Sequence, residues 1–211
     1  IYQVTQDRGE RCNAARAYLR PHLNRPNLRV TAHAQVQRIL FDGRRAVGVE
    51  VKVGGQLRRL QAKREVVLAA GAIQSPQLLM LSGVGDAAQL QGHGIEVRHH
   101  LPGVGANLQD HYVSRVQHRV KDSISTNQLA HGARLAGEVA KFFLRGNGAL
   151  TFGVTSAMVF CRSREGLASP DLQLLFTPAS YAQGVFRQLE RQPGMTVAVC
   201  PVRPESRGTI M

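Results

Sequence analysis

The sequence contains no tryptophan and few aromatic residues, which make up 5% of its 211 residues. Proteins that bind single-stranded nucleic acid usually stack bases on aromatic side chains, so this composition argues against that class. Acidic residues are also scarce: 14 Asp and Glu stand against 27 Lys and Arg, which gives a formal net charge of +13. Only four of the 27 are lysines, and the arginines are scattered along the chain. We therefore expect no nucleic-acid partner; salt-dependent retention on DNA would reverse that expectation.

Cysteine is rare as well. Cys12, Cys161 and Cys200 lie far apart without a CxxC pair, and their odd number argues against a disulfide framework and a zinc site. No apolar run reaches the roughly 20 residues that span a bilayer, and the polar first ten residues do not form a signal peptide. We expect no metal, no transmembrane segment and a cytoplasmic location, with peripheral attachment to a membrane left open. Because the chain begins at Ile1 without a methionine, we also expect it to be part of a longer protein.

Alternating apolar residues between turn signals predict a three-stranded antiparallel meander over about residues 35–62. The strands cover Gln35–Phe41, Ala46–Val53 and Leu57–Ala62, and a short strand at Leu28–Ala32 precedes them. The two turns of the meander are marked by Asp-Gly at 42–43 and Gly-Gly at 54–55. A helix over Cys12–Arg20 is predicted from its alanines, and Pro21 ends it.

The segment 64–85 predicts a strand, a tight turn and a helix in succession. Glu65–Ala69 is a short, mostly apolar run that is typical of a strand buried on both faces. The small residues at 70–72 let the backbone turn and approach another group closely. Ser75 is expected to cap the following helix, with Pro76 in its first position and Gly83 at its end. This combination provides a place where a dinucleotide can lie against an α/β sheet.

The stretch GAIQSPQLLMLSGVG at 71–85 also resembles the second signature of the glucose–methanol–choline (GMC) oxidoreductases. These are FAD-dependent enzymes that oxidise alcohols. The resemblance extends to RCNAARAYLRP at 11–21, LPGVGANLQDH at 101–111 and PVRPESRGTI at 201–210, and so runs over the whole chain. It implies an α/β fold that combines part of a Rossmann-like FAD-binding domain, with the meander as its crossover, and the start of an α+β substrate-binding domain.

The resemblance further implies a division of the chain and a set of contacts. Residues 1–100 would be the later half of the FAD-binding domain and 101–211 a partial substrate-binding domain. Val36 would contact the adenine of FAD through its backbone, and the turn at Ala70 and Gly71 would lie near the cofactor. Thr151 and Phe152 would line the substrate cavity, although each of these residues also has an ordinary packing role as its alternative. The glycine fingerprint that binds the diphosphate in this family is absent from the chain.

The second half of the chain predicts further strands at Tyr112–Val120, Thr155–Cys161, Leu172–Thr177 and Met195–Val202, and a helix at Leu129–Leu144. A short helix over Asp86–Gly94 and an extended segment up to Leu101 connect the two halves.

No catalytic residue is expected within the chain. The family's catalytic base is a histidine with a second histidine or asparagine partner, and the resemblance places both beyond Met211. Asp110 and His111 are sequence neighbours, which point in opposite directions on an extended chain, so they do not predict an acid–base pair. His99 and His100 lack a third ligand at a suitable spacing and do not predict a metal site.

Two functions remain open. The first is FAD-dependent alcohol oxidation, in which a hydride passes from the alcohol carbon to the flavin and the electrons go on to a quinone-type acceptor or oxygen. This chain would be an incomplete portion of such an enzyme, inactive and a poor FAD binder on its own. The second is a non-enzymatic α/β binding module that keeps only the scaffold.

Overall fold

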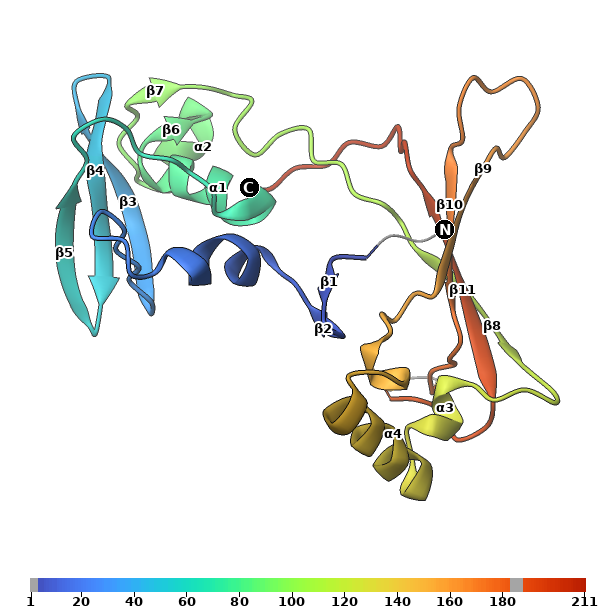
Figure 1. Cartoon of the computed structure of the whole chain (residues 1–211). Coiled ribbons are helices and arrows are strands. Elements are labelled where there is room, and N and C mark those ends of the chain that lie inside the picture. The colour runs from blue at the N-terminus through green and yellow to red at the C-terminus, as the bar shows by residue number, and fades with distance from the viewer. Residues whose placement is uncertain (1–3, 183–187) are drawn as a thin grey trace. The chain divides into compact units, whose positions relative to one another are not determined.

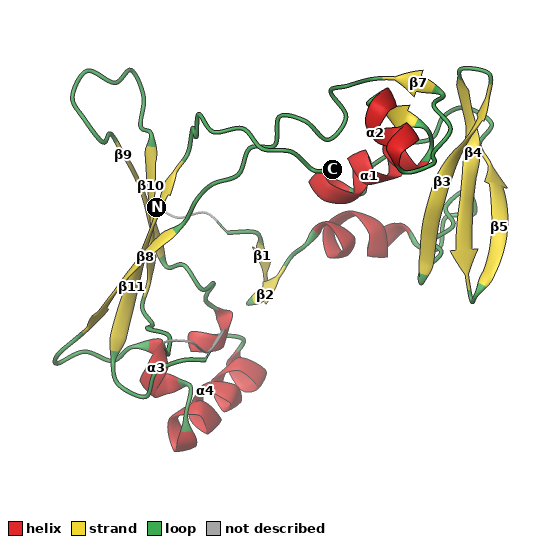
Figure 2. Cartoon of the chain, turned by 180° about the vertical axis from the view of Figure 1, so that it is seen from behind, coloured by secondary structure: helices red, strands yellow, loops and turns green. Residues whose placement is uncertain are grey.

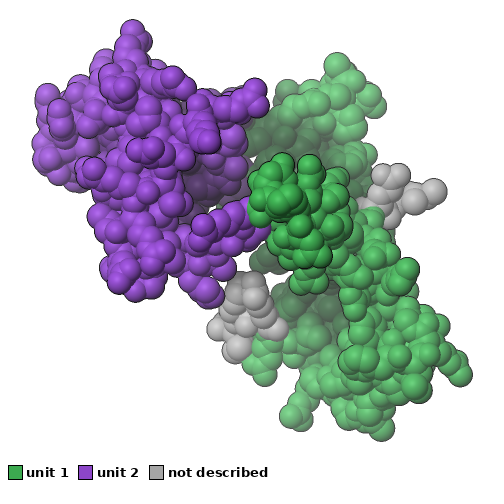
Figure 3. All heavy atoms as spheres, turned by 60° about the vertical axis from the view of Figure 1, so that its left-hand side comes forward, with its two compact units in different colours: residues 1–28, 111–204 green, residues 29–110, 205–211 purple. Residues whose placement is uncertain are grey.

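A computed structural model describes residues 4–182 and 188–211 of the chain. Their contacts divide the chain into two compact units (Figure 3). Unit 1 comprises residues 1–28 and 111–204, and unit 2 comprises residues 29–110 and 205–211. These units do not coincide with the expected domains 1–100 and 101–211, because both ends of the chain fold onto the other half. The domain assignment therefore stays a prediction about the family's architecture.

The meander forms the sheet of unit 2, as predicted (Figure 1). Its strands are β3 (Ala34–Asp42), β4 (Arg45–Val53) and β5 (Gln56–Gln61), and all pairs are antiparallel. The register shifts between Val36 and Arg38, where a bulge adds Gln37 to β3. Because of this extra residue, Val36 and Ile39 both lie opposite valines that share one face of β4.

Two helices and a short parallel strand pair complete unit 2. They are α1 (Gly71–Leu81), β6 (Val84–Gly85), α2 (Ala87–Gly92) and β7 (His99–His100), and β6 pairs with β7. Met80, Leu90 and Val104 are buried together as the core of this part. Gly83 ends α1 at φ +85°, and a Cβ there would lie 2.5 Å from the Glu96 carbonyl oxygen, so the predicted helix stop is confirmed.

Three predictions for this unit are wrong. No described residue pairs with Glu65–Ala69 as a strand, and Val67 is 77% exposed, because a strand exists only where a neighbour completes its hydrogen bonds. Leu28–Ala32 likewise forms no strand. Helix α1 begins at Gly71 instead of Pro76, which lies inside the helix.

Unit 1 contains a four-stranded antiparallel sheet in the order β8-β11-β10-β9 (Figure 2). The strands are β8 (Ser114–Arg119), β9 (Ala157–Cys161), β10 (Leu172–Thr177) and β11 (Gly194–Pro201). All four agree with the predicted strands within a few residues. The predicted helix is divided into α3 (Thr126–Leu129) and α4 (Gly132–Arg145), because Gly132 has a φ of +56°.

The first part of unit 1 departs from its prediction. Two short strands, β1 (Gln6–Asp7) and β2 (Glu10–Arg11), pair with each other. The predicted helix at Cys12–Arg20 is instead a π-helix, η1 (Ala15–Leu19), followed by the 3₁₀ turn η2 (Arg20–His22). Another 3₁₀ turn, η3 (Ala149–Thr151), follows α4.

None of the described helices combines the length and the apolar character that a membrane crossing requires.

Candidate functional site

The first candidate region is the turn that leads into α1. Ala70 precedes the helix, and Gly71 follows with a φ of +86°. This left-handed backbone conformation is rare for residues with a side chain. A Cβ at Gly71 would meet nothing within 4 Å, so the glycine is not required by packing within the chain. The backbone of this turn is exposed and accessible to a ligand.

The sequence around Ser75 and Pro76 keeps this turn in place, although not as predicted. The Ala70 N–H donates to Ser75 Oγ at 3.1 Å, so Ser75 reaches back over the first turn of the helix instead of standing at its start. The first N–H groups of an α-helix have no acceptor within the helix. Pro76 has no N–H of its own and leaves the Ala72 carbonyl without its usual helical donor. The first N–H groups of α1 therefore depend on acceptors from outside the helix.

Val36 lies on β3 immediately before the bulge, opposite Val51. Its side chain is 38% exposed, whereas Val51 is 2% exposed. Gln37, the additional residue, donates from its side chain to the Gln35 carbonyl at 3.2 Å. The strand edge next to Val36 therefore has irregular backbone geometry, which is common where a strand re-aims its groups toward a binding site.

Ser82 connects this strand to α1, and sequence reasoning missed it. It is 4% exposed. Its Oγ accepts the Ile39 N–H at 2.8 Å and donates to the Leu78 carbonyl at 2.6 Å. One hydroxyl thus joins the outer edge of β3 to the last turn of the helix. The sequence feature that could have indicated this role is the position of Ser82 directly before the glycine that ends the helix.

An ionic ladder lies on the face of the meander opposite to the Val36 side chain. Glu50 on β4 bonds Arg38 through both carboxylate oxygens, at 3.0 and 3.2 Å, and lies 3.5 Å from Arg59 on β5. These hydrogen bonds, foremost that from Arg38, lower the pKa of Glu50 below its usual value. Among the described residues, Glu50 is the acidic partner of both arginines, so this cluster has a net positive charge at neutral pH.

These features fit a nucleotide cofactor at unit 2. A positive-φ glycine with open space above it, at a helix start whose first N–H groups lack acceptors within the helix, favours an anionic ligand. Val36, Ala70 and Gly71 lie in this same unit. Their contacts with FAD stay a prediction.

The second candidate region lies in unit 1, around Thr151 and Phe152. Thr151 ends η3, and its Oγ donates to the Gly148 carbonyl at 2.8 Å. The Gln6 side chain also donates to the Thr151 carbonyl, which ties the chain's first strand to this turn. Phe152 is 75% exposed. An exposed phenylalanine beside a fixed threonine is compatible with the predicted substrate contact, which the structure leaves untested.

Glu138 holds this turn in position, and it too was missed from the sequence. It is 7% exposed, and its carboxylate accepts the Ala149 N–H and the Lys141 Nζ, each at 2.6 Å. The Lys141 bond first, and the Ala149 bond second, lower its pKa. Gly148 has a φ of +100°, and a Cβ there would lie 2.7 Å from Glu138 Oε2. The signal was a single acidic residue within an otherwise apolar and basic helix.

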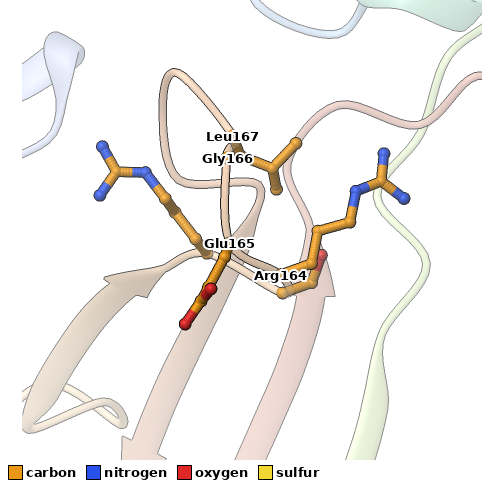
Figure 4. Close-up of a pocket in the computed structure, with 6 residues that line it drawn as sticks. Arg164, Glu165, Gly166 and Leu167 are labelled. Atoms are coloured by element: carbon orange, nitrogen blue, oxygen red, sulfur yellow. The ribbon is translucent and has the colours of Figure 1, made fainter.

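A shallow hollow lies elsewhere in unit 1, in the loop between β9 and β10 (Figure 4). Arg164 and Glu165 point away from each other there, so they do not form a joint site. Asp171 anchors the loop by accepting the Ser163 N–H at 2.8 Å and the Ser163 hydroxyl at 2.6 Å, and these bonds lower its pKa. The hollow has no connection to the predicted site residues.

No group of three or more His, Cys, Asp or Glu in the described part of the chain is arranged to hold a metal. The pair at 99–100 forms strand β7, where His100 Nδ1 accepts the Ala87 N–H at 3.0 Å. His100 therefore has a structural role at the start of α2.

Comparison with known proteins identifies the family of this chain. The family model described as GMC oxidoreductase matches residues 1–113. An uncharacterized GMC-type oxidoreductase of Mycobacterium tuberculosis is 46% identical over 98% of this chain and 38% of its own length. An oxygen-dependent choline dehydrogenase of Brucella anthropi is 40% identical over 99% of this chain and 38% of its length. The chain thus spans about two fifths of these relatives.

Solved structures agree with this comparison. Formate oxidase of Aspergillus oryzae, solved to study modification of its FAD, matches with a TM-score of 0.83 and 26% identity, over 96% of this chain and 39% of that one. A fungal aryl-alcohol oxidase shares the fold with a TM-score of 0.75 at 21% identity, over 96% of this chain and 42% of its own. The mixed α/β fold of an FAD-binding flavoprotein is thereby confirmed, and with it the prediction of FAD as the family's cofactor. The chain belongs to the GMC oxidoreductase family.

Proposed function

We propose that this chain is part of an FAD-dependent GMC enzyme that oxidises an alcohol. In this proposal unit 2 forms part of the cofactor-binding site, and the turn at 148–152 in unit 1 forms part of the substrate cavity. The observation that supports it most is the open, positive-φ backbone at Gly71, which no contact within the chain requires. FAD, when bound, supplies the two-electron acceptor for the oxidation.

The residues of the chain have roles in binding and positioning in this scheme. Ala70 and Gly71 offer backbone groups to the cofactor, and Val36 offers the irregular edge of β3. Ser82 fixes that edge against α1. Glu138 fixes the turn that carries Thr151 and Phe152. The base that removes the alcohol proton lies outside the chain, so the expectation that the chain alone is inactive follows from the same scheme.

A chimeric enzyme tests the proposal. Residues 1–211 would replace the matching 38% of the Brucella anthropi choline dehydrogenase. We expect the purified chimera to carry FAD, seen by its visible absorbance, and to reduce a dye with choline or another primary alcohol. A folded but colourless chimera would contradict the proposed role of the chain in FAD binding. A yellow chimera that oxidises none of a panel of alcohols would contradict the proposal that the substrate is an alcohol.

A matched pair of glycine variants in that chimera tests the predicted contact. Gly71→Val places a side chain in the open space above the turn, and we expect FAD occupancy to fall several-fold. The control is Gly54→Val. Gly54 also has a positive φ, +56°, and a Cβ there would meet nothing within 4 Å, but this glycine lies in the β4–β5 turn. Both variants carry the same kind of backbone strain, so an equal loss of FAD in both would remove Gly71 from the site.

A further inference from the structure

The hairpin formed by β1 and β2 has a strained tip. Its strands pair Asp7 with Glu10, so Arg8 and Gly9 alone form the connecting loop. Both loop residues have a positive φ, +51° and +78°, as a type I′ hairpin turn requires. For Arg8 this conformation is unfavourable, because its Cβ crowds the following carbonyl oxygen. Backbone strain of this kind persists only where the surrounding structure holds the chain in place, so the contacts of the tip are of interest.

The two strands of the hairpin are joined by further bonds. The Arg16 guanidinium lies 3.3 Å from Asp7 Oδ2 and also bonds the Glu10 carboxylate. The Cys12 N–H donates to the Thr5 carbonyl at 3.1 Å, which extends the pairing beyond β1 and β2. The hairpin is therefore a connected unit, and a change at its tip displaces the groups that the tip contacts.

The tip contacts both ends of the turn that carries Thr151. A Cβ on Gly9 would lie 3.0 Å from the Gly146 carbonyl oxygen and 3.0 Å from Thr151 Cγ2. Carbon atoms pack best at roughly 3.5–4.0 Å, so even a methyl group at position 9 would push the tip and the turn apart. Next to the tip, the Gln6 side chain donates to the Thr151 carbonyl. The hairpin thus contacts Thr151 at its methyl group and at its backbone.

These contacts also fix the residue that follows. The Thr151 hydroxyl donates to the Gly148 carbonyl at 2.8 Å, which leaves its methyl group beside Gly9. Phe152 comes next, and 75% of its side chain is exposed. The position from which this ring projects is therefore set by Gly9 and Gln6 on one side of the turn.

We infer that the β1–β2 hairpin positions the turn that binds substrate, with Gly9 and Gln6 as the positioning residues. The inference rests on the proposed function, because it takes Thr151 and Phe152 as residues that line the substrate cavity. The hairpin acts through these two residues and sets where they meet an alcohol. A misplacement of about 1 Å in such a group is enough to weaken binding or catalysis strongly.

Gly9→Ala in the chimera described above tests this inference. We expect KM for choline, or for the panel alcohol that the chimera oxidises fastest, to rise at least about threefold, while kcat changes by less than about twofold. The matched control is Gly43→Ala. Gly43 has a φ of +54° in the β3–β4 turn, and a Cβ there would meet nothing within 4 Å. The control carries the same kind of backbone strain, so its KM should stay unchanged, and FAD absorbance should be equal in both variants.

A double variant separates the contact from the strain. Thr151→Ser removes the methyl group that the new Cβ of Gly9→Ala would meet, and it keeps a hydroxyl for the Gly148 carbonyl. The rise in KM that Gly9→Ala causes should therefore be smaller in the Thr151→Ser background than in the wild-type background. An equal rise in the two backgrounds would show that the effect does not pass through Thr151, and would overturn the inference.

Amide hydrogen exchange distinguishes a failure of this inference from a failure of the proposed function. In Gly9→Ala, and in Gln6→Ala as a second variant, the peptide that covers residues 148–152 should exchange faster than in Gly43→Ala. Unchanged exchange would refute the positioning role of the hairpin and leave the substrate role of the turn standing. Faster exchange with an unchanged KM would refute the substrate role of the turn, and the inference with it. Exchange requires no catalysis, so a chimera that oxidises no alcohol still tests the contact, whereas its inactivity counts against the proposed function.

Discussion

The two units bury different kinds of side chain. In unit 2 the buried residues are mainly aliphatic, as in the cluster of Met80, Leu90 and Val104. In unit 1 they are mainly polar, and the buried hydrophobic residues there are small: Ala179 and Cys200. The buried polar residues of unit 1 are Ser125, Asn127, Glu138, Thr177, Ser180 and Thr196.

Asn127 shows how unit 1 is held together. It is fully buried, and its amide donates to the carbonyls of Ser180 and Glu190, each at 2.8 Å, while its Oδ1 accepts the Ser180 N–H at 3.0 Å. One side chain on α3 thus ties together two segments more than fifty residues away. Each such hydrogen bond adds only about 1 kcal/mol of net stability, but removing one partner leaves the other buried and unpaired, which costs more. The difference teaches that unit 2 has a buried apolar core, whereas the fully buried residues of unit 1 form mainly a hydrogen-bonded polar network.

The sharpest test of this comparison removes apolar volume from unit 2. Leu90→Ala should destabilise unit 2 by about 3 kcal/mol, because Leu90 is 1% exposed and its loss leaves a cavity beside Met80. Urea unfolding followed by amide hydrogen exchange in unit 2 measures the change. Leu57→Ala, at a position 59% exposed on β5, should change stability by less than about 0.5 kcal/mol. Equal effects at the two positions would show that unit 2 has no working core.

Removing the side-chain amide of Asn127 tests whether the buried polar network stabilises unit 1. Asn127→Ala should cost about 2 kcal/mol, because it leaves buried groups of Ser180 and Glu190 without their partners. Hydrogen exchange at Ser180 and in β11 would report it. The control is Asn147→Ala at an exposed position after α4. If Asn127→Ala exchanges like the wild-type chain, the network does not hold unit 1 together.

Ser82 provides a polar test within unit 2. Ser82→Ala should cost about 1 kcal/mol and speed exchange of the Ile39 amide, which loses its acceptor. Ser75→Ala is the matched control, since its hydroxyl accepts from Ala70 at the exposed end of the same helix. A faster Ile39 amide in both variants would mean that the whole of α1 is loosened, and would weaken the assigned contact.

The smallest expected effect is on the pH dependence of unit 1. Hydrogen bonds from Lys141 and Ala149 lower the pKa of Glu138 in the folded chain. A lowered pKa contributes stability that is complete above the unfolded value, near 4.5, and is lost as the pH falls through the folded value. The melting temperature measured between pH 7 and pH 3 should therefore fall less on acidification in Glu138→Gln than in wild type. Glu165→Gln in the β9–β10 loop should follow wild type, and an unchanged slope in Glu138→Gln would contradict the assigned bonds.

Much of the local structure was predictable because it depends on neighbours in the sequence. The meander follows from alternating valines between Asp-Gly and Gly-Gly turns, and the ends of α1 and α4 follow from Gly83 and Gly146, which adopts φ +62°. The strands of the second sheet were likewise found within a few residues. The family resemblance rested on the signature at 71–85, which comparison confirmed.

What the tertiary structure decided concerns partners distant in the sequence. The run Glu65–Ala69 has strand-forming residues but no described strand beside it, so it forms none. Which serine fixes α1 was decided by the approach of β3 to Ser82. Glu138 of α4 accepts the Ala149 N–H of η3, and Phe143 on the same helix is 78% exposed, although the amphipathic pattern alone favours burial of this phenylalanine. The sequence pattern shows which side chains of a segment share a face. It does not show which residues pack against that face, because the chain topology brings those residues there. The site and the residues that hold it in position could therefore be found only from the structure.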